Sequence, residues 1–276
     1  MPDTATTSRW DIRLEDLTLG YGDRVVLQQV NATLPAGQIS VILGGSGCGK
    51  STLLRHILGL NRPLAGRLSL AGRDLFALPH REFRKARRRM GVLFQDGALL
   101  GSLTLGDNVA LPLREHTRLA PATVNAIVHH KLALVGLADF ADYYPNQLSG
   151  GMRKRAGLAR AIVMDPPILL CDEPTSGLDP INAAQMDQLL LDMKAQYPDM
   201  TIVVVSHDLA SLDRIADYVL VLNEGHSVYA GDLPTLRATE DPYLRDFLDR
   251  KPRQHQVTDV ALDPAIHAEL AQWLDR

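Results

Sequence analysis

The sequence has 276 residues, of which 46% are hydrophobic and 22% are charged, and its formal net charge is −3. This composition is typical of a globular protein with a large core, and the acidic balance argues against a protein that binds DNA or RNA. The two cysteines exclude a disulfide framework. Because the sequence has no N-terminal apolar segment and no apolar stretch of about 18 residues, we expect neither secretion nor a membrane span.

Residues 11–34 alternate apolar and polar side chains in two short runs, which predicts antiparallel strands joined by a turn at residues 20–23. Tyr21 lies at the tip of this turn. An aromatic side chain there could be an ordinary edge-strand residue, or its ring could stack on the base of a bound nucleotide.

Residues 41–52 read VILGGSGCGKST and fit the phosphate-loop pattern G-x-x-x-x-G-K-[ST]. Glycines let such a loop wrap a polyphosphate with its backbone N–H groups pointing inward, while Lys50 reaches the β- and γ-phosphates and Ser51 binds Mg²⁺. A glycine-rich turn that binds nothing is the alternative, but a buried strand at 39–43 and a helix at 51–60 give the required context. The predicted phosphate-binding residues are Gly44, Gly45, Ser46, Gly47, Cys48, Gly49, Lys50, Ser51 and Thr52.

Residues 66–75 read as one short strand, and the basic residues 81–90 have helical spacing. The basic segment is either a solvated helix face or an electrostatic contact for anionic lipid or an acidic partner.

A buried strand at 90–94 ends at Gln95, and ligands gather at such strand ends in open α/β sheets. Gln95 could supply an oxygen to Mg²⁺ or orient the attacking water, and a turn-capping glutamine is the alternative.

Helical periodicity dominates residues 97–165, which predicts an inserted helical subdomain. Within it, Ser149, Gly150 and Gly151 directly precede a helix and form a second anion-binding helix start, or only an N-cap. Two phosphate-binding loops for one nucleotide are redundant within one subunit. The second loop would therefore serve a nucleotide bound by another copy of the chain.

Two further strands end in residues suited to catalysis. The apolar run before Asp172 and Glu173 places Asp172 in the Mg²⁺ shell and Glu173 where it can accept a proton from water. The strand at 201–209 ends near His207, which is either structural or in contact with the γ-phosphate. A hairpin follows at 217–231.

The tail at 251–276 ends in an amphipathic stretch that would dock on its own domain or on a second subunit. Its apolar face is shared by Ile266, Leu270, Trp273 and Leu274.

Taken together, Tyr21, the phosphate loop, Gln95, LSGGM at 148–152, ILLCDEP at 168–174, SGLD at 176–179 and His207 resemble the ATP-binding subunits of ABC transporters over residues 10–248. The resemblance implies an α/β fold of the P-loop NTPase class, with a RecA-like core, an antiparallel β subdomain and an inserted helical subdomain. Residues 249–276 would form a C-terminal extension.

The family implies that two subunits enclose two ATP molecules, each between one phosphate loop and the other subunit's LSGG turn. By the same resemblance, Tyr21 stacks on adenine, Gln95 senses the γ-phosphate and Mg²⁺, Glu173 is the base, and Asp179 lies where the subunits meet. Ser149 and Gly151 contact the opposite γ-phosphate. Met152 occupies the place where most members have Gln, and its side chain cannot make a glutamine's hydrogen bonds.

A narrower resemblance, carried by FQDGALLGSLTLGDNVALPLREHT at 94–117, is to the ATPases of Mla/Mce-type systems. These systems move phospholipids across the bacterial envelope and maintain outer-membrane lipid asymmetry. The resemblance implies a homodimer on the cytoplasmic face of the inner membrane, held there by a permease whose short helix docks around residues 99–113. An MCE-domain lipid-binding subunit and a small regulatory subunit are further implied partners. The alternatives are an importer for a polar solute such as an amino acid, and a non-transport ABC ATPase.

Overall fold

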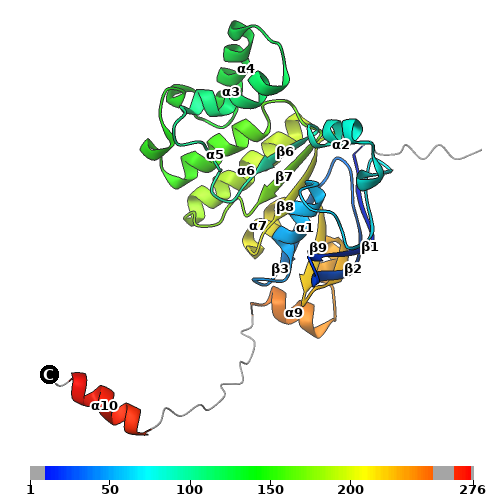
Figure 1. Cartoon of the computed structure of the whole chain (residues 1–276), viewed down its shortest axis with the longest axis vertical. Helices are drawn as coiled ribbons and strands as arrows, with labels where there is room; N and C mark the ends of the chain where they lie inside the picture. Colours follow the sequence, from blue (N-terminus) through cyan, green and yellow to red (C-terminus); the bar gives the residue numbers. More distant parts are fainter. Residues whose placement is uncertain (1–9, 251–263, 275–276) are drawn as a thin grey trace, which may run out of the picture. The chain divides into compact units, whose positions relative to one another are not determined.

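The computed structural model describes residues 10–250 and 264–274. These residues fall into two compact units that divide between Ala238 and Thr239. Each unit is described by itself, and Figure 1 shows the elements of both. The domain boundary expected at residue 248 stays a prediction, and the helix just before it, α9 (Pro242–Leu248), falls in the second unit.

A six-stranded sheet in the order β10-β9-β3-β8-β7-β6 is the centre of the first unit. Five of its strands are parallel, and only β10 runs antiparallel to its neighbour. Its strands are β3 (Ile39–Gly44), β6 (Met90–Leu93), β7 (Ile168–Asp172), β8 (Thr201–Val205), β9 (Tyr218–Asn223) and β10 (His226–Asp232). The central strands are continuous apolar runs because both faces of a parallel sheet are covered. The parallel order brings the carboxyl ends of β3, β6, β7 and β8 to one edge of the sheet.

The second sheet is antiparallel, in the order β2-β1-β4-β5. It is formed by β1 (Ile12–Tyr21), β2 (Arg24–Leu34), β4 (Ala65–Leu70) and β5 (Arg73–Asp74). The prediction of one strand over residues 66–75 is wrong, because Ala71 and Gly72 both have positive φ and form a turn between β4 and β5. Helix α1 (Lys50–Ile57) contacts strands of both sheets, so one hydrophobic core joins the sheets around it.

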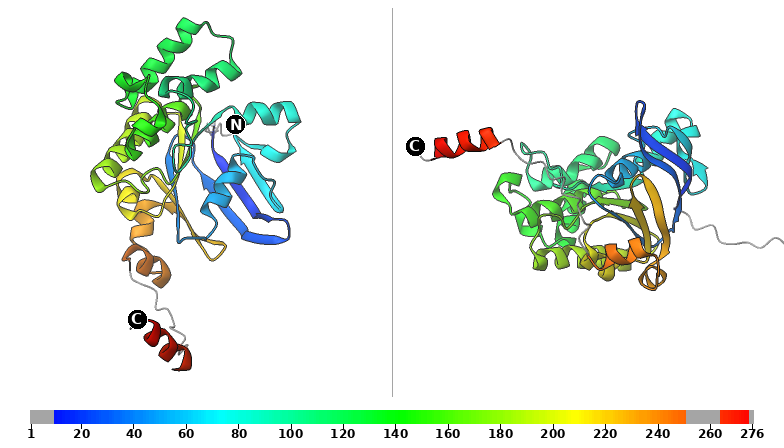
Figure 2. Two further views of the ribbon diagram at one scale, coloured as in Figure 1. Left: turned by 60° about the vertical axis from the view of Figure 1, so that its left-hand side comes forward. Right: turned by 90° about the horizontal axis from the view of Figure 1, so that it is seen from below.

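The helical subdomain expected at 97–165 is present. Its helices α3 (Leu105–His116), α4 (Pro121–Leu134) and α5 (Gly150–Ala161) pack on one another, and α5 also packs on β6. Figures 1 and 2 show these three helices grouped away from β1 and β2. The remaining helices of the first unit are α2 (His80–Arg87), α6 (Pro180–Gln196), α7 (Leu209–Ile215) and α8 (Leu233–Arg237), with 3-10 turns at Leu75–Ala77, Ala138–Phe140 and Pro145–Gln147.

The second unit contains α9 and α10 (Pro264–Leu274). Ile266, Trp273 and Leu274 are exposed on α10, while the side chain of Leu270 lies outside the described residues. The surface on which this helix docks stays a prediction. None of the helices in the described part of the chain combines the length and apolar character needed to cross a bilayer.

Candidate active site

The predicted phosphate loop connects the carboxyl end of β3 to the first turn of α1. Gly49 precedes the helix with φ 107°, and a Cβ on it would lie 2.7 Å from the Leu27 side chain. A Cβ on Gly44 would lie 2.4 Å from both the Leu222 carbonyl oxygen and the Cys48 sulfur. Gly44 thus packs closely on the Leu222 backbone and Gly49 on the Leu27 side chain, and both have a positive φ that favours glycine. The strand, loop and helix context predicted from the sequence is confirmed.

The Lys50 side chain folds back along the loop and is buried. Its Nζ donates hydrogen bonds to the carbonyl oxygens of Gly44 at 2.8 Å and Gly45 at 2.9 Å. These contacts hold the ammonium group over the loop, where the backbone N–H groups and the start of α1 also contribute positive potential. The loop is thus suited to a polyanion.

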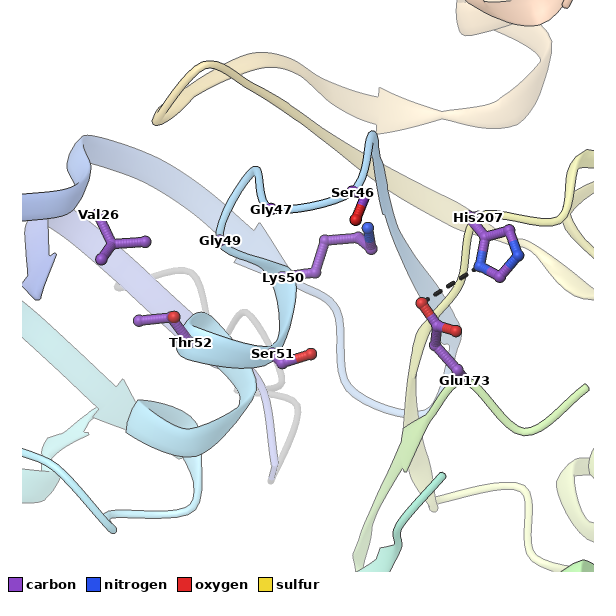
Figure 3. Close-up of a pocket in the computed structure, with 9 residues that line it drawn as sticks. All are labelled: Val26, Ser46, Gly47, Gly49, Lys50, Ser51, Thr52, Glu173 and His207. Carbon is purple, nitrogen blue, oxygen red and sulfur yellow. Dashed lines mark ion pairs between the residues drawn. The ribbon is translucent and has the colours of Figure 1, made fainter. Parts of the chain in front are cut away.

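A cavity of about 500 Å³ opens above this loop. It is lined by Val26, Ser46, Gly47, Gly49, Lys50, Ser51, Thr52, Glu173 and His207. Figure 3 shows the phosphate loop on one side and Glu173 with His207 on the other. Residues far apart in the sequence thus supply an ammonium group, hydroxyl groups, a carboxylate and an imidazole to one space, which matches the polarity of a nucleoside triphosphate and its attacking water.

Glu173 follows the last residue of β7 and has φ 47°, a left-handed conformation that is uncommon for a residue with a side chain. Its backbone N–H donates to the Val205 carbonyl oxygen on the neighbouring strand at 2.9 Å. The Glu173 Oε1 atom lies 3.2 Å from His207 Nδ1. Adjacent strands thus bring the two residues together at the carboxyl edge of the sheet, as their positions in the sequence predict.

Asp172 lies beside the loop, with its Oδ1 atom 3.4 Å from the Ser51 hydroxyl. Burial, followed by the nearby charge of Glu173, raises the pKa of Asp172 above its ordinary value, while the Ser51 hydrogen bond opposes this shift. A divalent cation beside the carboxylate would favour its charged form. The Ser51 and Asp172 oxygens are ligands of the kind that Mg²⁺ prefers, so the pair fits the predicted metal site.

Tyr21 and Gln95 are two of the predicted residues that do not line this cavity; Gly44, Gly45, Cys48 and Asp172 are others. The Tyr21 hydroxyl is 3.4 Å from Arg55 Nη1, and its ring is tilted against His56, with 43% of the residue exposed. Gln95 follows β6 and is exposed at the same edge of the sheet as Glu173. Their contacts with adenine and with Mg²⁺ stay predictions.

The LSGG turn and Asp179 also lie outside the cavity. The Ser149 hydroxyl accepts a hydrogen bond from the Met152 N–H at 3.2 Å, so Ser149 does cap α5, and Gly150 beside it is exposed. Asp179 caps α6 by accepting from the N–H groups of Ile181 and Asn182. The side-chain hydrogen bond from Asn182 is the main cause that lowers the pKa of Asp179. Both caps leave their neighbouring surface exposed.

Two residues of the site, Val26 and Lys154, were not predicted from the sequence. Val26 lines the cavity from β2. The only feature of the sequence that could have indicated this role is its position in an alternating strand just after the turn that carries Tyr21. Lys154 is buried in α5 and donates to the Glu173 carbonyl oxygen at 3.1 Å. Nothing in the local sequence distinguishes Lys154 from the solvated Arg153 next to it.

Comparisons with known proteins were made on the whole chain. The family model described as ABC transporter matches residues 27–176. The chain is 43% identical over 257 residues to the probable ribonucleotide transport ATP-binding protein mkl of Mycobacterium tuberculosis, covering 88% of this chain and 71% of that protein. The chain belongs to the ABC transporter ATP-binding family. This ABC ATPase is also 39% identical over 238 residues to the intermembrane phospholipid transport system ATP-binding protein MlaF of Escherichia coli, covering 86% and 88% of the two chains.

Solved structures agree with the fold of the ABC ATPase. The dimeric structure of a bacterial ABC transporter cassette matches with a TM-score of 0.74 and 33% identity, over 80% of this chain and 98% of that one. The structure of cbiO1 of Clostridium perfringens, part of the ABC transporter complex cbiONQ, matches with a TM-score of 0.75 and 29% identity, over 88% of this chain and 96% of that one. The predicted fold class is therefore confirmed, and the reaction of this ABC ATPase is ATP hydrolysis.

Proposed function

We propose that two copies of the chain bind two ATP molecules, each between the phosphate loop of one copy and the Ser149–Gly151 turn of the other. The observation that supports this most is the position of the turn, which lies outside its own subunit's cavity although Lys50, Glu173 and His207 all line it. Exposed Gly150 at the start of α5 suits a phosphate that arrives from another molecule.

In this proposal Glu173 accepts the proton of the attacking water, and His207 holds the Glu173 carboxylate and contacts the γ-phosphate. Ser51, Asp172 and Gln95 are the proposed Mg²⁺ ligands, and the metal would neutralise charge on the transferring phosphoryl group. Lys50 and the opposing Ser149 turn stabilise that charge from two sides. In the same proposal Tyr21 and Val26 contact the base and ribose side of the nucleotide, and Asp179 contacts the other subunit.

The transported substrate that we propose is a phospholipid. Support comes from the name of the Escherichia coli relative, a phospholipid transport ATP-binding protein that aligns over 88% of its length. The chain would then work at the cytoplasmic face of the inner membrane, attached through a permease, with an MCE-domain lipid-binding subunit and a small regulatory subunit as further partners. The Mycobacterium relative is named for ribonucleotide transport, so a polar solute is the second candidate.

A groove of about 550 Å³ next to Gln95 suits the proposed permease helix. Its lining includes the apolar side chains of Leu60, Phe94 and Leu111 together with Arg84, Arg87 and Arg88 of the basic segment. An amphipathic helix binds such a groove through apolar anchors spaced three or four residues apart. The three arginines predict acidic residues on that helix. Helix α2 has no buried residue, as a solvated helix face requires, and the contact of its basic residues with an acidic partner is part of this proposal.

Replacing Phe94 with Arg is expected to weaken binding of the permease by about 100-fold, because a charge would be buried among the apolar anchors of the interface. Hydrolysis by the isolated subunit should change by less than about two-fold, since Phe94 does not line the nucleotide cavity. Co-purification from detergent-solubilised membranes measures the first effect, and phosphate release measures the second. Val228→Arg is the matched control, because both residues are 40% exposed and Val228 lies on β10 away from the groove.

Purifying the tagged chain with its native membrane partners tests the proposed substrate. We expect mass spectrometry to find a permease, an MCE-domain protein and co-purified phospholipid, and we expect phospholipid vesicles to raise the ATPase rate of the reconstituted complex. A complex that contains a soluble binding protein, and whose ATPase rate responds to a ribonucleotide or an amino acid but not to phospholipid, would favour the second candidate.

A further inference from the structure

Helix α5 connects three loops of the catalytic unit. Ser149, the residue proposed to contact the partner's nucleotide, caps its start. Near its other end, Arg160 donates to the carbonyl oxygens of Gly97 and Ala98, both at 2.8 Å, in the loop that follows Gln95. Gly157 allows this loop to approach closely, since a Cβ there would lie 2.9 Å from Gly97 Cα. The helix is therefore fixed to the Gln95 loop.

Between these ends, Lys154 fixes the same helix to the loop that carries Glu173. Lys154 is 6% exposed, and its Nζ donates to the Ser176 carbonyl oxygen at 2.6 Å, the Ser176 hydroxyl at 3.1 Å and the Glu173 carbonyl oxygen at 3.1 Å. An ammonium group has three donors, and all three are used within four residues of one loop. These hydrogen bonds replace part of the hydration that the buried ammonium group has lost.

The backbone N–H and the backbone carbonyl oxygen of Glu173 are thus held by different elements. Its N–H donates to Val205 on β8, and its carbonyl oxygen accepts from both the Ser176 N–H at 3.2 Å and Lys154. A left-handed conformation at a residue with a side chain persists only when the surroundings impose it. The same conformation directs the Glu173 carboxylate toward His207 and the cavity. Burial lowers the pKa of Lys154, and the charges of Asp96 and Glu173 oppose that shift.

We propose that Lys154 is a positioning residue that holds Glu173 in its catalytic conformation through the Glu173 carbonyl oxygen, and that it links this conformation to the position of the Ser149 turn on the same helix. The inference rests on the proposed role of Glu173 as the base. It means that engagement of the partner's nucleotide at one end of α5 sets the geometry of the subunit's own catalytic carboxylate.

Replacing Lys154 with Met keeps the length of the side chain and removes all three donors. We expect kcat for ATP hydrolysis to fall by about 10- to 100-fold, while KM for ATP changes by less than about two-fold, because the phosphate loop is untouched and only the base is misplaced. In the Glu173→Gln background, the same substitution should cause no further loss, since Lys154 acts through the carboxylate already removed. Steady-state phosphate release over a range of ATP concentrations gives kcat and KM for wild type, for each single variant and for the variant that carries both substitutions.

Lys194→Met is the matched control, because Lys194 also donates to a backbone carbonyl, that of Pro198, but at the far end of α6. It should leave kcat unchanged. Ser176→Ala removes a single acceptor and should lower kcat by about two- to five-fold at constant KM, which keeps the test decisive if the Lys154 variant does not fold. The inference is overturned if Lys154→Met and Ser176→Ala both have wild-type kcat. It is also overturned if Lys154→Met lowers kcat by the same factor in the Glu173→Gln background as in the wild-type background. If wild type and Glu173→Gln hydrolyse ATP equally, it is instead the proposed role of Glu173 that fails.

Discussion

Replacing Glu173 with Gln is expected to lower kcat for ATP hydrolysis by about 10²- to 10⁴-fold, the usual contribution of a general base. The amide keeps the shape of the side chain but cannot accept the proton of the attacking water at neutral pH. In the wild-type chain the Glu173 carboxylate lines the cavity opposite Lys50 and lies 3.2 Å from His207 Nδ1. The described cavity lining contains no second carboxylate that could replace it.

Binding of ATP and ATP-driven dimerisation should survive this substitution, because the groups that hold the phosphates belong to the loop at 44–52 and to the LSGG turn. Fluorescent nucleotide binding and size-exclusion chromatography with ATP measure these two properties. Glu240→Gln, which changes an exposed carboxylate of the second unit, is the matched control and should behave as wild type. Hydrolysis at the wild-type rate by the Glu173 variant would refute its role as the base.

The edge of the sheet at which this chemistry gathers could be predicted from the sequence. Each of Gly44, Gln95, Glu173 and His207 follows a short apolar run, and parallel strands place the ends of such runs side by side. The order of the strands could not be predicted in the same way, and the contact between Glu173 and His207 requires that β7 and β8 be neighbours. The gathering of these residues at one edge of the sheet was therefore predictable, but their pairing was not.

Contacts made by side chains on packed helices were not predictable, because they depend on how α5 docks on the sheet. Lys154 is buried and Arg153 is exposed, although both continue the same basic run. The difference arises from the rotation of α5, which turns Gly157 toward Gly97 and Lys154 toward the Glu173 carbonyl oxygen. The groove beside Phe94 has the same origin, since it forms between α2, β6 and α3, which are separate in the sequence. Tertiary packing, and not local pattern, decides these positions.

The proposed division of each site between two subunits predicts that two inactive variants restore activity when they are mixed. Lys50→Met removes the ammonium group of the phosphate loop, and Ser149→Asp places a negative charge where the partner's phosphate should lie. Aspartate also caps helices well, so α5 should stay intact. Each variant alone forms dimers in which both sites are defective, and we expect its hydrolysis to fall by at least about 100-fold.

A mixed dimer contains one complete site, formed by the normal loop of the Ser149→Asp chain and the normal turn of the Lys50→Met chain. Random pairing makes half of the dimers mixed, each with one of its two sites complete, so an equimolar mixture should recover up to about a quarter of wild-type activity. Phosphate release during titration of one variant into the other measures this recovery, and a chain carrying both substitutions, mixed with either variant, is the control that should recover none. For wild type, the rate at low concentration should rise with the square of the monomer concentration. Absence of recovery together with a linear dependence on concentration would mean that one chain contains a complete site, and that the Ser149 turn is only the cap of α5.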